Sequence, residues 1–158
     1  MAETPTASLA VNPFADNPPA EARPYALEAQ VGFLLRKAQQ RHLAIFAALM
    51  IEGLTAQQFA TLARLAEVGP TSQNALGRLT AMDNSTINGV VRRLKQRGLV
   101  ATEPAPDDNR MHLVALTEAG ARLVGKAVPV GHEITAQTLA PLSPAEQASF
   151  LRLLRKLG

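Results

Sequence analysis

A cluster of short hydrogen-bonding residues precedes a cluster of positive charge in residues 84 to 97. The first cluster comprises Asn84, Ser85, Thr86, Asn88 and Gly89, and the second comprises Arg92, Arg93, Lys95 and Arg97. Short side chains can reach the edges of base pairs, and an asparagine can pair bidentately with adenine. Arginine and lysine can bind phosphates as counterions. This order predicts a helix that enters the major groove of DNA with its first residues.

The same segment has the apolar spacing of an amphipathic helix. Its apolar residues recur at i, i+3, i+4 and i+7, and they are Ile87, Val90, Val91 and Leu94. We expect Asp83 or Asn84 to cap this helix and Gly98 to end it. A merely solvated helix face would explain the charge, but it would explain neither Gly89 nor the short polar cluster. Candidate DNA contacts also include Ser72, Gln73 and Asn74, in the helix that precedes it.

A β-hairpin is predicted directly after this helix. Two short strands, Leu99 to Glu103 and Met111 to Leu116, flank the turn-forming segment PAPDDNR. We expect Asp108 to orient Arg110 for insertion into the minor groove, which attracts arginine where it is narrow. The alternative is a turn with a surface ion pair of little energetic value.

Helix signals predict the elements that position these groups. A long helix is expected from Tyr25 to about Ile51, and a second from Thr55, with Gln58 completing a capping box, to about Val68. A short helix follows from Ser72 to Thr80, capped by Thr71, with Ala75, Leu76 and Leu79 inward. After the hairpin, a helix capped by Thr117 is expected to be broken or bent at Pro129. Ser143, Pro144 and Glu146 begin a last helix with the apolar face Phe150, Leu151, Leu154 and Leu157.

This order predicts a mainly α fold with a small β-hairpin wing, a winged helix-turn-helix over residues 55–117. Residues 1–24 contain five prolines and predict an extended arm, which is either a loose tail or a wrap around a partner subunit. The 158-residue chain has no cysteine, which excludes thiolate catalysis and thiolate zinc sites. It lacks a long apolar run and a signal-peptide pattern, so we expect a soluble, cytoplasmic protein.

These segments resemble the winged-helix core of the multiple-antibiotic-resistance regulator (MarR) family. The resemblance rests on Ser85-Thr86-Ile87, Arg93-Leu94, Gly98-Leu99-Val100, Asp108-x-Arg110 and Leu116-Thr117-x-x-Gly120, in this order and spacing. It implies a homodimer, with residues 25–54 and 118–158 as the dimerisation region, that binds a palindromic operator in double-stranded DNA. It also implies a repressor released by a small aromatic or phenolic ligand, with no cofactor. The long proline-rich arm and the interruption at Pro129 and Gly131 depart from the family pattern.

A candidate effector site lies on the first helix. His42 falls on its apolar stripe, Arg41 is adjacent, and Phe46, Met50 and Phe59 could supply apolar walls. His42 and Arg41 would then bind the carboxylate or ring heteroatom of an aromatic ligand. The alternative is a core histidine bonded to a backbone carbonyl.

Three other functions remain as alternatives. Residues 120 to 126 satisfy the phosphate-loop pattern G-x-x-x-x-G-K of nucleotide-binding enzymes, but Ala127 replaces the Ser or Thr that binds Mg²⁺. A metal-responsive regulator would have to use His42, His112, His132 and Glu133, which lack the spacing of a metal site. A winged helix used only for protein contacts would not need the basic cluster. We therefore expect a regulator and not an enzyme, with no metal site.

Overall fold

The computed structural model describes residues 25–105 and 108–158, with the backbone alone described at 108–111. The chain divides into two compact units, residues 1–36 and 37–158. In the first unit, the 3-10 turn Leu27–Ala29 ends at Gln30, whose backbone is extended (φ −79°, ψ 132°). Because of this extended residue, helix α1 begins at Val31 and not at the predicted Tyr25; it runs to Leu49. The predicted arm, residues 1–24, lies outside the described residues.

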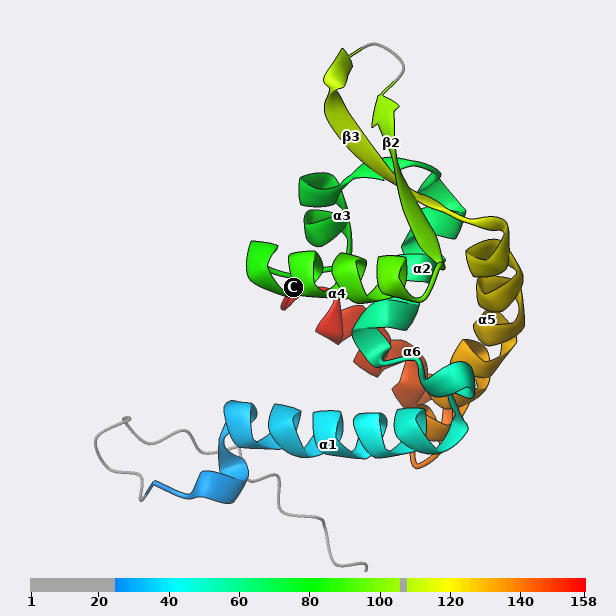
Figure 1. Ribbon diagram of the computed structural model, residues 1–158. Helices are drawn as coiled ribbons and strands as arrows, with labels where there is room; N and C mark the ends of the chain where they lie inside the picture. The colour runs from blue at the N-terminus through cyan, green and yellow to red at the C-terminus, as the bar shows by residue number, and fades with distance from the viewer. Residues whose placement is uncertain (1–24, 106–107) are drawn as a thin grey trace, which may run out of the picture. The chain divides into compact units, whose positions relative to one another are not determined.

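The second unit contains helices and a small antiparallel sheet. After α1 come the 3-10 turn Ile51–Gly53, α2 (Ala56–Val68), β1 (Thr71–Ser72), α3 (Gln73–Leu79), α4 (Asn84–Gln96), β2 (Val100–Ala105), β3 (Asp108–Leu116), α5 (Glu118–Leu139) and α6 (Pro144–Leu154). The hairpin of β2 and β3 protrudes beyond α3 and α4 (Figure 1). The predicted fold class, mainly α with a β-hairpin wing, is confirmed. The hairpin strands are longer than predicted.

The sheet contains a strand that the sequence did not indicate. β1 pairs with β3 through Thr71↔Val114 and Ser72↔Leu113, so the strand order is β1-β3-β2. Thr71 therefore belongs to the sheet, and its hydroxyl donates to the carbonyl oxygen of Gly69 at 3.0 Å. The predicted cap of α3 was wrong by one residue, because Ser72 Oγ accepts from the N–H of Ala75.

The core lies between α2, α3, α4 and the sheet. The predicted stripe of α4 is confirmed, since its four members Ile87, Val90, Val91 and Leu94 are all buried. Leu62 and Leu65 from α2 and Leu76 from α3 pack into the same cluster. Leu79 is the exception to the prediction for α3. It is 44% exposed, because it is the last residue of a short helix.

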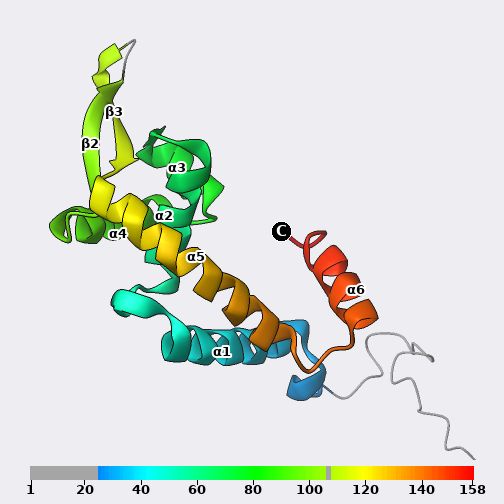
Figure 2. The same cartoon turned by 90° about the vertical axis from the view of Figure 1, so that its right-hand side faces the viewer.

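Helix α5 is a single helix of 22 residues that contains Pro129, so of the two predicted outcomes, a break or a bend, the break is wrong (Figure 2). Its contacts with α2 explain the tolerance of the proline. A Cβ on Gly131 would come within 2.7 Å of the Phe59 ring, so the two helices approach closely there. A Cβ on Gly120 would lie 2.0 Å from the carbonyl oxygen of Leu99. These close contacts hold α5 against the rest of the fold on both sides of Pro129.

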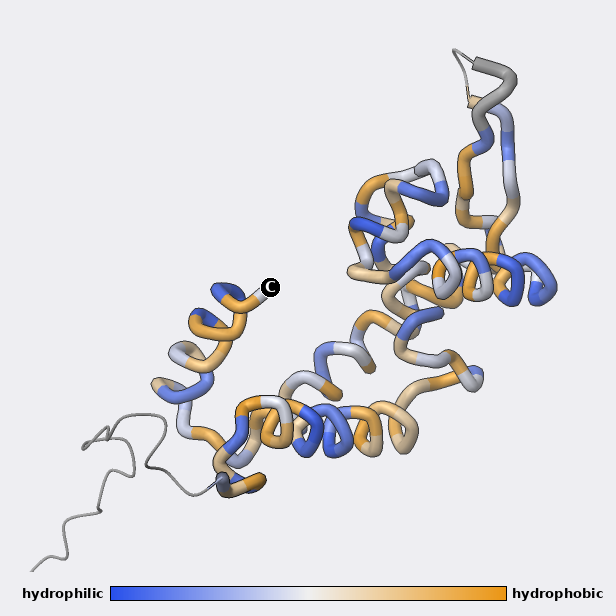
Figure 3. Tube along the Cα trace, turned by 90° about the vertical axis from the view of Figure 1, so that its left-hand side faces the viewer, coloured by the Kyte–Doolittle hydropathy of each residue, from blue (hydrophilic) through white to orange (hydrophobic). Residues whose placement is uncertain are grey.

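Helix α6 begins as predicted. Both the N–H and the hydroxyl of Ser143 donate to Glu146, at 2.8 and 2.7 Å, and these bonds lower the pKa of that carboxyl. Figure 3 shows hydrophobic and hydrophilic residues alternating along this helix. Its apolar residues are not covered within the single chain, since Phe150 and Leu154 are each 40% exposed. Leu157 lies beyond the helix end.

Candidate nucleic-acid interface and an adjoining cavity

A hydrogen-bonded carboxylate fixes the start of α4. Asp83 is the N-cap, and its carboxylate accepts from the N–H of Thr86 at 2.8 Å, the Ser85 hydroxyl at 2.8 Å and the Thr86 hydroxyl at 2.9 Å. The bond from the Thr86 N–H contributes most, and together these bonds lower the pKa of Asp83 to about 2. The carboxylate is therefore ionised at neutral pH and holds both hydroxyls in one orientation.

The outer face of α4 carries the predicted DNA contacts. Asn84, Ser85 and Asn88 are exposed, and so are Arg92 and Arg93 one to two turns later. Thr86 and Gly89 are half-buried at the edge of this face. A Cβ on Gly89 would meet only the guanidinium of Arg93, at 3.6 Å, so packing within the chain does not require a glycine there. A DNA backbone or base edge that approaches Gly89 closely would require one.

The basic residues of α4 separate into two groups. Arg92 and Arg93 are exposed and form no hydrogen bond or ion pair with the described residues. Lys95 donates to the Thr102 hydroxyl of β2 at 2.6 Å, and Arg97 donates to the carbonyl oxygen of Glu52 at 2.8 Å. Lys95 therefore connects α4 to the wing strand.

The predicted contacts from α3 lie beside those from α4. Gln73 Nε2 donates to Asn88 Oδ1, so the two amides are in direct contact. Ser72 uses its hydroxyl oxygen to cap α3, whereas Asn74 is exposed. On the wing, the pairing of β2 with β3 extends to Ala105↔Asp108. The side chains of Asp108 and Arg110 lie outside the described residues, so their predicted roles stay predictions.

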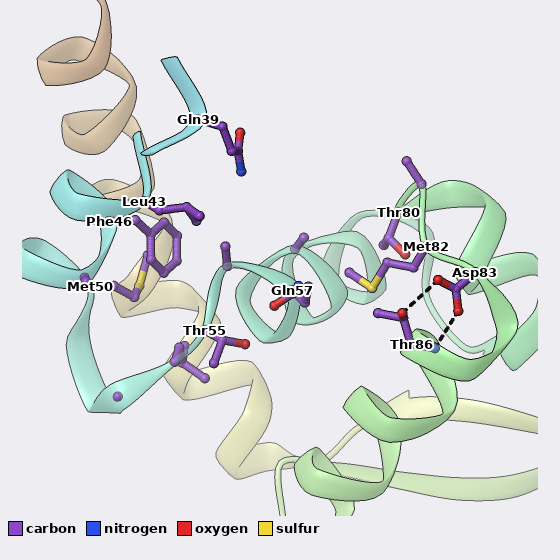
Figure 4. A pocket seen from close by; sticks show the side chains of 16 residues that line it. Gln39, Leu43, Phe46, Met50, Thr55, Gln57, Thr80, Met82, Asp83 and Thr86 are labelled. Carbon is purple, nitrogen blue, oxygen red and sulfur yellow. Dashed lines mark hydrogen bonds between the residues drawn. The ribbon is translucent and has the colours of Figure 1, made fainter. Parts of the chain in front are cut away.

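A cavity of about 740 Å³ adjoins the start of α4 (Figure 4). Gln39, Leu43 and Phe46 line it from α1, Met50 lines it directly after the end of that helix, and Thr55 and Gln57 line it from the start of α2. The opposite wall comes from the turn between α3 and α4 and from the first turn of α4, and it includes Thr80, Met82, Asp83 and Thr86. Asp83 is the one ionisable residue among the described residues that line this cavity. The carboxylate that caps α4 is thus also part of the cavity wall.

Only some of the predicted effector residues line the cavity. Phe46 and Met50 line the cavity, whereas Arg41, His42 and Phe59 do not. Arg41 donates to the carbonyl oxygen of Gln137 at 3.0 Å, and His42 Nδ1 lies 3.0 Å from the Thr138 hydroxyl oxygen. His42 therefore bonds a side chain of α5 and not a backbone carbonyl.

Two stripes on α1 explain this division. The cavity-lining residues of this helix, Gln39, Leu43, Phe46 and Ala47, follow the spacing i, i+4, i+7 and i+8, and Met50 continues this face directly after the helix. Arg41 and His42 lie on the side that bonds α5. The rings of His42 and Phe59 flank Phe46, with centroids 6.3 and 6.1 Å from it. The cavity-lining stripe can be recognised in the sequence by its spacing. Spacing alone does not show which face of a helix borders a cavity.

Two of the alternative functions, the nucleotide-binding enzyme and the metal-responsive regulator, find no site in the described residues. Residues 120 to 126 form part of α5, whereas a phosphate loop must be a loop that follows a strand. In the part of the chain that the structure describes, no three His, Asp or Glu side chains gather as metal ligands. No helix there is long and apolar enough to cross a membrane.

Comparison with known proteins finds relatives that cover most of the chain. Residues 52–111 match the sequence profile of the MarR family. The repressor NicR of Pseudomonas putida, an HTH-type transcriptional repressor, is 44% identical over 140 residues, 88% of this chain and 89% of its own.

Two solved structures share the fold. BpsR of Bordetella bronchiseptica, whose DNA binding is regulated by 6-hydroxynicotinic acid, has a TM-score of 0.82 at 43% identity, covering 85% of this chain and 97% of its own. The regulator PcaV of Streptomyces coelicolor, in complex with its natural ligand, has a TM-score of 0.79 at 32% identity, covering 85% and 96%.

Proposed function

The chain belongs to the MarR family of transcriptional regulators, and from this membership we propose a homodimeric repressor that a small aromatic acid releases from a palindromic operator. The observation that supports the proposal is that Asp83 contributes both to the start of α4 and to the cavity. Its carboxylate caps the helix that presents the candidate DNA contacts, and it also forms part of the wall of the 740 Å³ cavity. A molecule in the cavity would therefore lie against the start of the recognition helix. The family regulates transcription and is not a class of enzymes.

The DNA-binding part of the proposal uses residues 55–117. Ser85, Thr86 and Asn88 are proposed to face base edges, because they lie at the start of α4. Arg92 and Arg93 would bind phosphates, because they have long cationic side chains on the same exposed helix. Arg110, at the tip of the wing, is proposed to enter the minor groove with Asp108 beside it.

The dimer is proposed to use residues 25–54 and 118–158. A palindromic operator presents two half-sites, and each chain carries one recognition helix. Large apolar side chains are exposed on α1 and on α6; they include Leu34, Leu35, Leu43, Phe150, Leu153 and Leu154. Exposed apolar residues at this density are typical of a surface that a second copy covers.

The effector is proposed to be a small aromatic acid of the class that regulates BpsR. Leu43, Phe46 and Met50 supply apolar contacts for a ring. Because Asp83 is negatively charged, the carboxylate of the acid is expected at the α1 end, away from α4. Arg41 and His42 bond Gln137 and Thr138 and do not line the cavity, although the other guanidinium nitrogens of Arg41 and the Nε2 atom of His42 remain for a carboxylate.

Binding of DNA by the pure protein tests the proposal. Fluorescence anisotropy with labelled duplex from upstream of its own gene should show saturable binding that weakens steeply with salt. Asn88→Ala should lose about 1–3 kcal/mol on this DNA and little on random duplex, because it removes a base contact. Arg92→Ala is the matched comparison and should weaken binding to both duplexes. Equal affinity of the wild type for both duplexes would contradict sequence-specific binding.

A further inference from the structure

A smaller cavity, of about 350 Å³, lies between the end of α4, the 3-10 turn before α2 and the first half of α5. It has no described lining residue in common with the cavity beside Asp83, so the two are separate. Its lining combines cationic with apolar side chains, namely Arg97, Arg122 and Lys126 with Ile51, Leu99 and Leu123. A cavity of this composition can hold a small molecule that has an anionic group and an apolar part.

Two of the cations extend from one face of α5. Arg122 and Lys126 are four residues apart, so they lie one turn apart on the same side of the helix. Lys126 is exposed and forms no hydrogen bond or ion pair with the described residues. Arg122 pairs with Glu118, which does not line the cavity, and the two side chains are 62% and 87% exposed. A pair this exposed contributes little, so both cations are available to a ligand.

Arg97 is held at the cavity by a bond to a neighbouring element. It follows the last residue of α4, and its Nη2 group donates to the carbonyl oxygen of Glu52 at 2.8 Å. Because a carbonyl group is neutral, this bond fixes the guanidinium without neutralising its charge, and other N–H donors of the group remain. Glu52 has a φ of 54°, in the left-handed region that few residues other than glycine adopt. Unusual backbone conformations of this kind recur at ligand-binding sites.

The charges that line this cavity favour an anion. The Glu52 carboxylate also lines it, but among the described residues it forms no ion pair with any of the three cations. Three cations and one carboxylate leave an excess of two positive charges.

We propose that this cavity is a second ligand site, which binds a small phosphate monoester with an apolar group. Arginine side chains match the oxygens of a phosphate group, and Ile51 and Leu123 would contact the apolar group. The site goes beyond the proposed function, because it requires neither the operator nor the cavity beside Asp83.

Calorimetry with phenyl phosphate at constant ionic strength tests the site. This probe joins an apolar ring to a phosphate group that is dianionic at about pH 8. The wild type should bind it about fivefold or more tightly than phenyl sulfate, which has a similar shape and one negative charge fewer. Lys126→Gln and Arg122→Gln should each weaken its binding by roughly five- to tenfold, because each removes a charge-assisted hydrogen bond.

Glu52→Gln should have the opposite effect and tighten binding about twofold or more. It removes the negative charge that lines the cavity and keeps the backbone carbonyl that Arg97 bonds. Arg64→Gln and Glu67→Gln are the matched controls, since they remove the same charges from an exposed pair on α2 outside this cavity. Both controls should leave the affinity for phenyl phosphate unchanged.

Unchanged affinity in both Lys126→Gln and Arg122→Gln would overturn the proposal, because the probe would then bind elsewhere. An equal loss in Arg64→Gln would also overturn it, since binding would then follow net charge alone. A third contrary outcome is that the two α5 variants bind random duplex DNA more weakly and phenyl phosphate as well as the wild type does. The cations would then contact the DNA backbone.

Discussion

A substitution at Gly89 should affect the stability of the protein and its DNA binding in opposite directions. The position lies within α4, where glycine is less favourable than alanine by about 1 kcal/mol. A Cβ there would meet only the Arg93 guanidinium, at 3.6 Å, which is ordinary contact. Nothing in the fold of the free protein therefore requires glycine, and we expect its role in the contact that α4 makes with DNA.

Gly89→Ala should raise the free energy of unfolding by up to about 1 kcal/mol and weaken operator binding. Urea denaturation measures the first effect and anisotropy measures the second. Arg92→Ala provides a comparison, since it should weaken binding through a lost phosphate contact and reduce the salt slope by about one unit. An alanine at 89 that stabilises the protein and leaves DNA affinity intact would remove Gly89 from the interface.

Asp83 gives a prediction that depends on pH. Its pKa is lowered from the ordinary value of 3.8 to about 2 by bonds from Thr86 and Ser85. Because the folded-state pKa is the lower one, the ionised cap stabilises the fold above about pH 4, and this contribution is lost as the pH falls through about 2. Carbon-detected NMR of the Asp83 carboxyl should show a midpoint near 2.

Thr86→Val is the matched variant for this titration, because it removes the hydroxyl donor and keeps the N–H donor. The midpoint should rise part of the way toward 3.8. A wild-type midpoint at 3.8 would show that the carboxylate is not held by these groups in solution, and the link between the cap and the cavity would lose its basis.

Two glycines of α5, Gly120 and Gly125, differ in how much space surrounds them. Gly120 lies in the first turn of this helix, and a Cβ there would lie 2.0 Å from the Leu99 carbonyl oxygen. The obstacle is backbone, so it cannot be relieved by a rotamer change. Gly125 lies in the same helix with nothing within 4 Å of its would-be Cβ.

Gly120→Ala should therefore destabilise the protein by about 1–3 kcal/mol or more, because α5 must move away from the start of β2. Gly125→Ala should stabilise it by up to about 1 kcal/mol through helix propensity. Thermal or urea denaturation measures both. Equal effects of the two substitutions would show that α5 does not pack on Leu99 as described.

The sequence predicted those elements whose signals are local. The Thr55–Gln58 capping box and the buried stripe of α4 follow from spacing within one helix, and both are confirmed. β1 was missed because a two-residue strand has no periodicity and depends on its pairing with β3. The sequence left a break or a bend at Pro129 open, because the continuity of α5 depends on packing against α2.

For the candidate site, too, the sequence predicted features within one helix and not the contacts between elements. The polar and basic face of α4 can be recognised from residue types, but the contact between Gln73 and Asn88 joins residues 15 positions apart. The position of Asp83 in the cavity wall likewise depends on how α1, α2 and the turn before α4 come together. Such contacts are set by tertiary packing, which no single-helix pattern contains.

For the whole molecule, the exposed apolar face of α6 predicts assembly. Phe150 is 40% exposed, and a charge there should prevent a second copy from covering the face. Phe150→Glu should give a monomer in light scattering and lose most operator binding. Ser149→Glu is the matched control, since it adds the same charge at the neighbouring exposed position and should leave the dimer intact.

Deletion of residues 143 to 158 extends this test to the whole of α6. The truncated protein should be monomeric or should aggregate, and it should not bind the operator. A well-behaved truncated dimer would place the interface elsewhere on the chain.

Coupling between the cavity and the recognition helix is the central claim, and a linkage measurement tests it most directly. The affinity for operator DNA is measured with and without saturating 6-hydroxynicotinate, and the affinity for 6-hydroxynicotinate is measured by calorimetry with and without operator. Because coupling is reciprocal, both affinities should fall by the same factor, roughly 5- to 150-fold. Asp83→Asn, which keeps a capping side chain without its charge, should change that factor. Operator affinity unaffected by bound 6-hydroxynicotinate would contradict the claim.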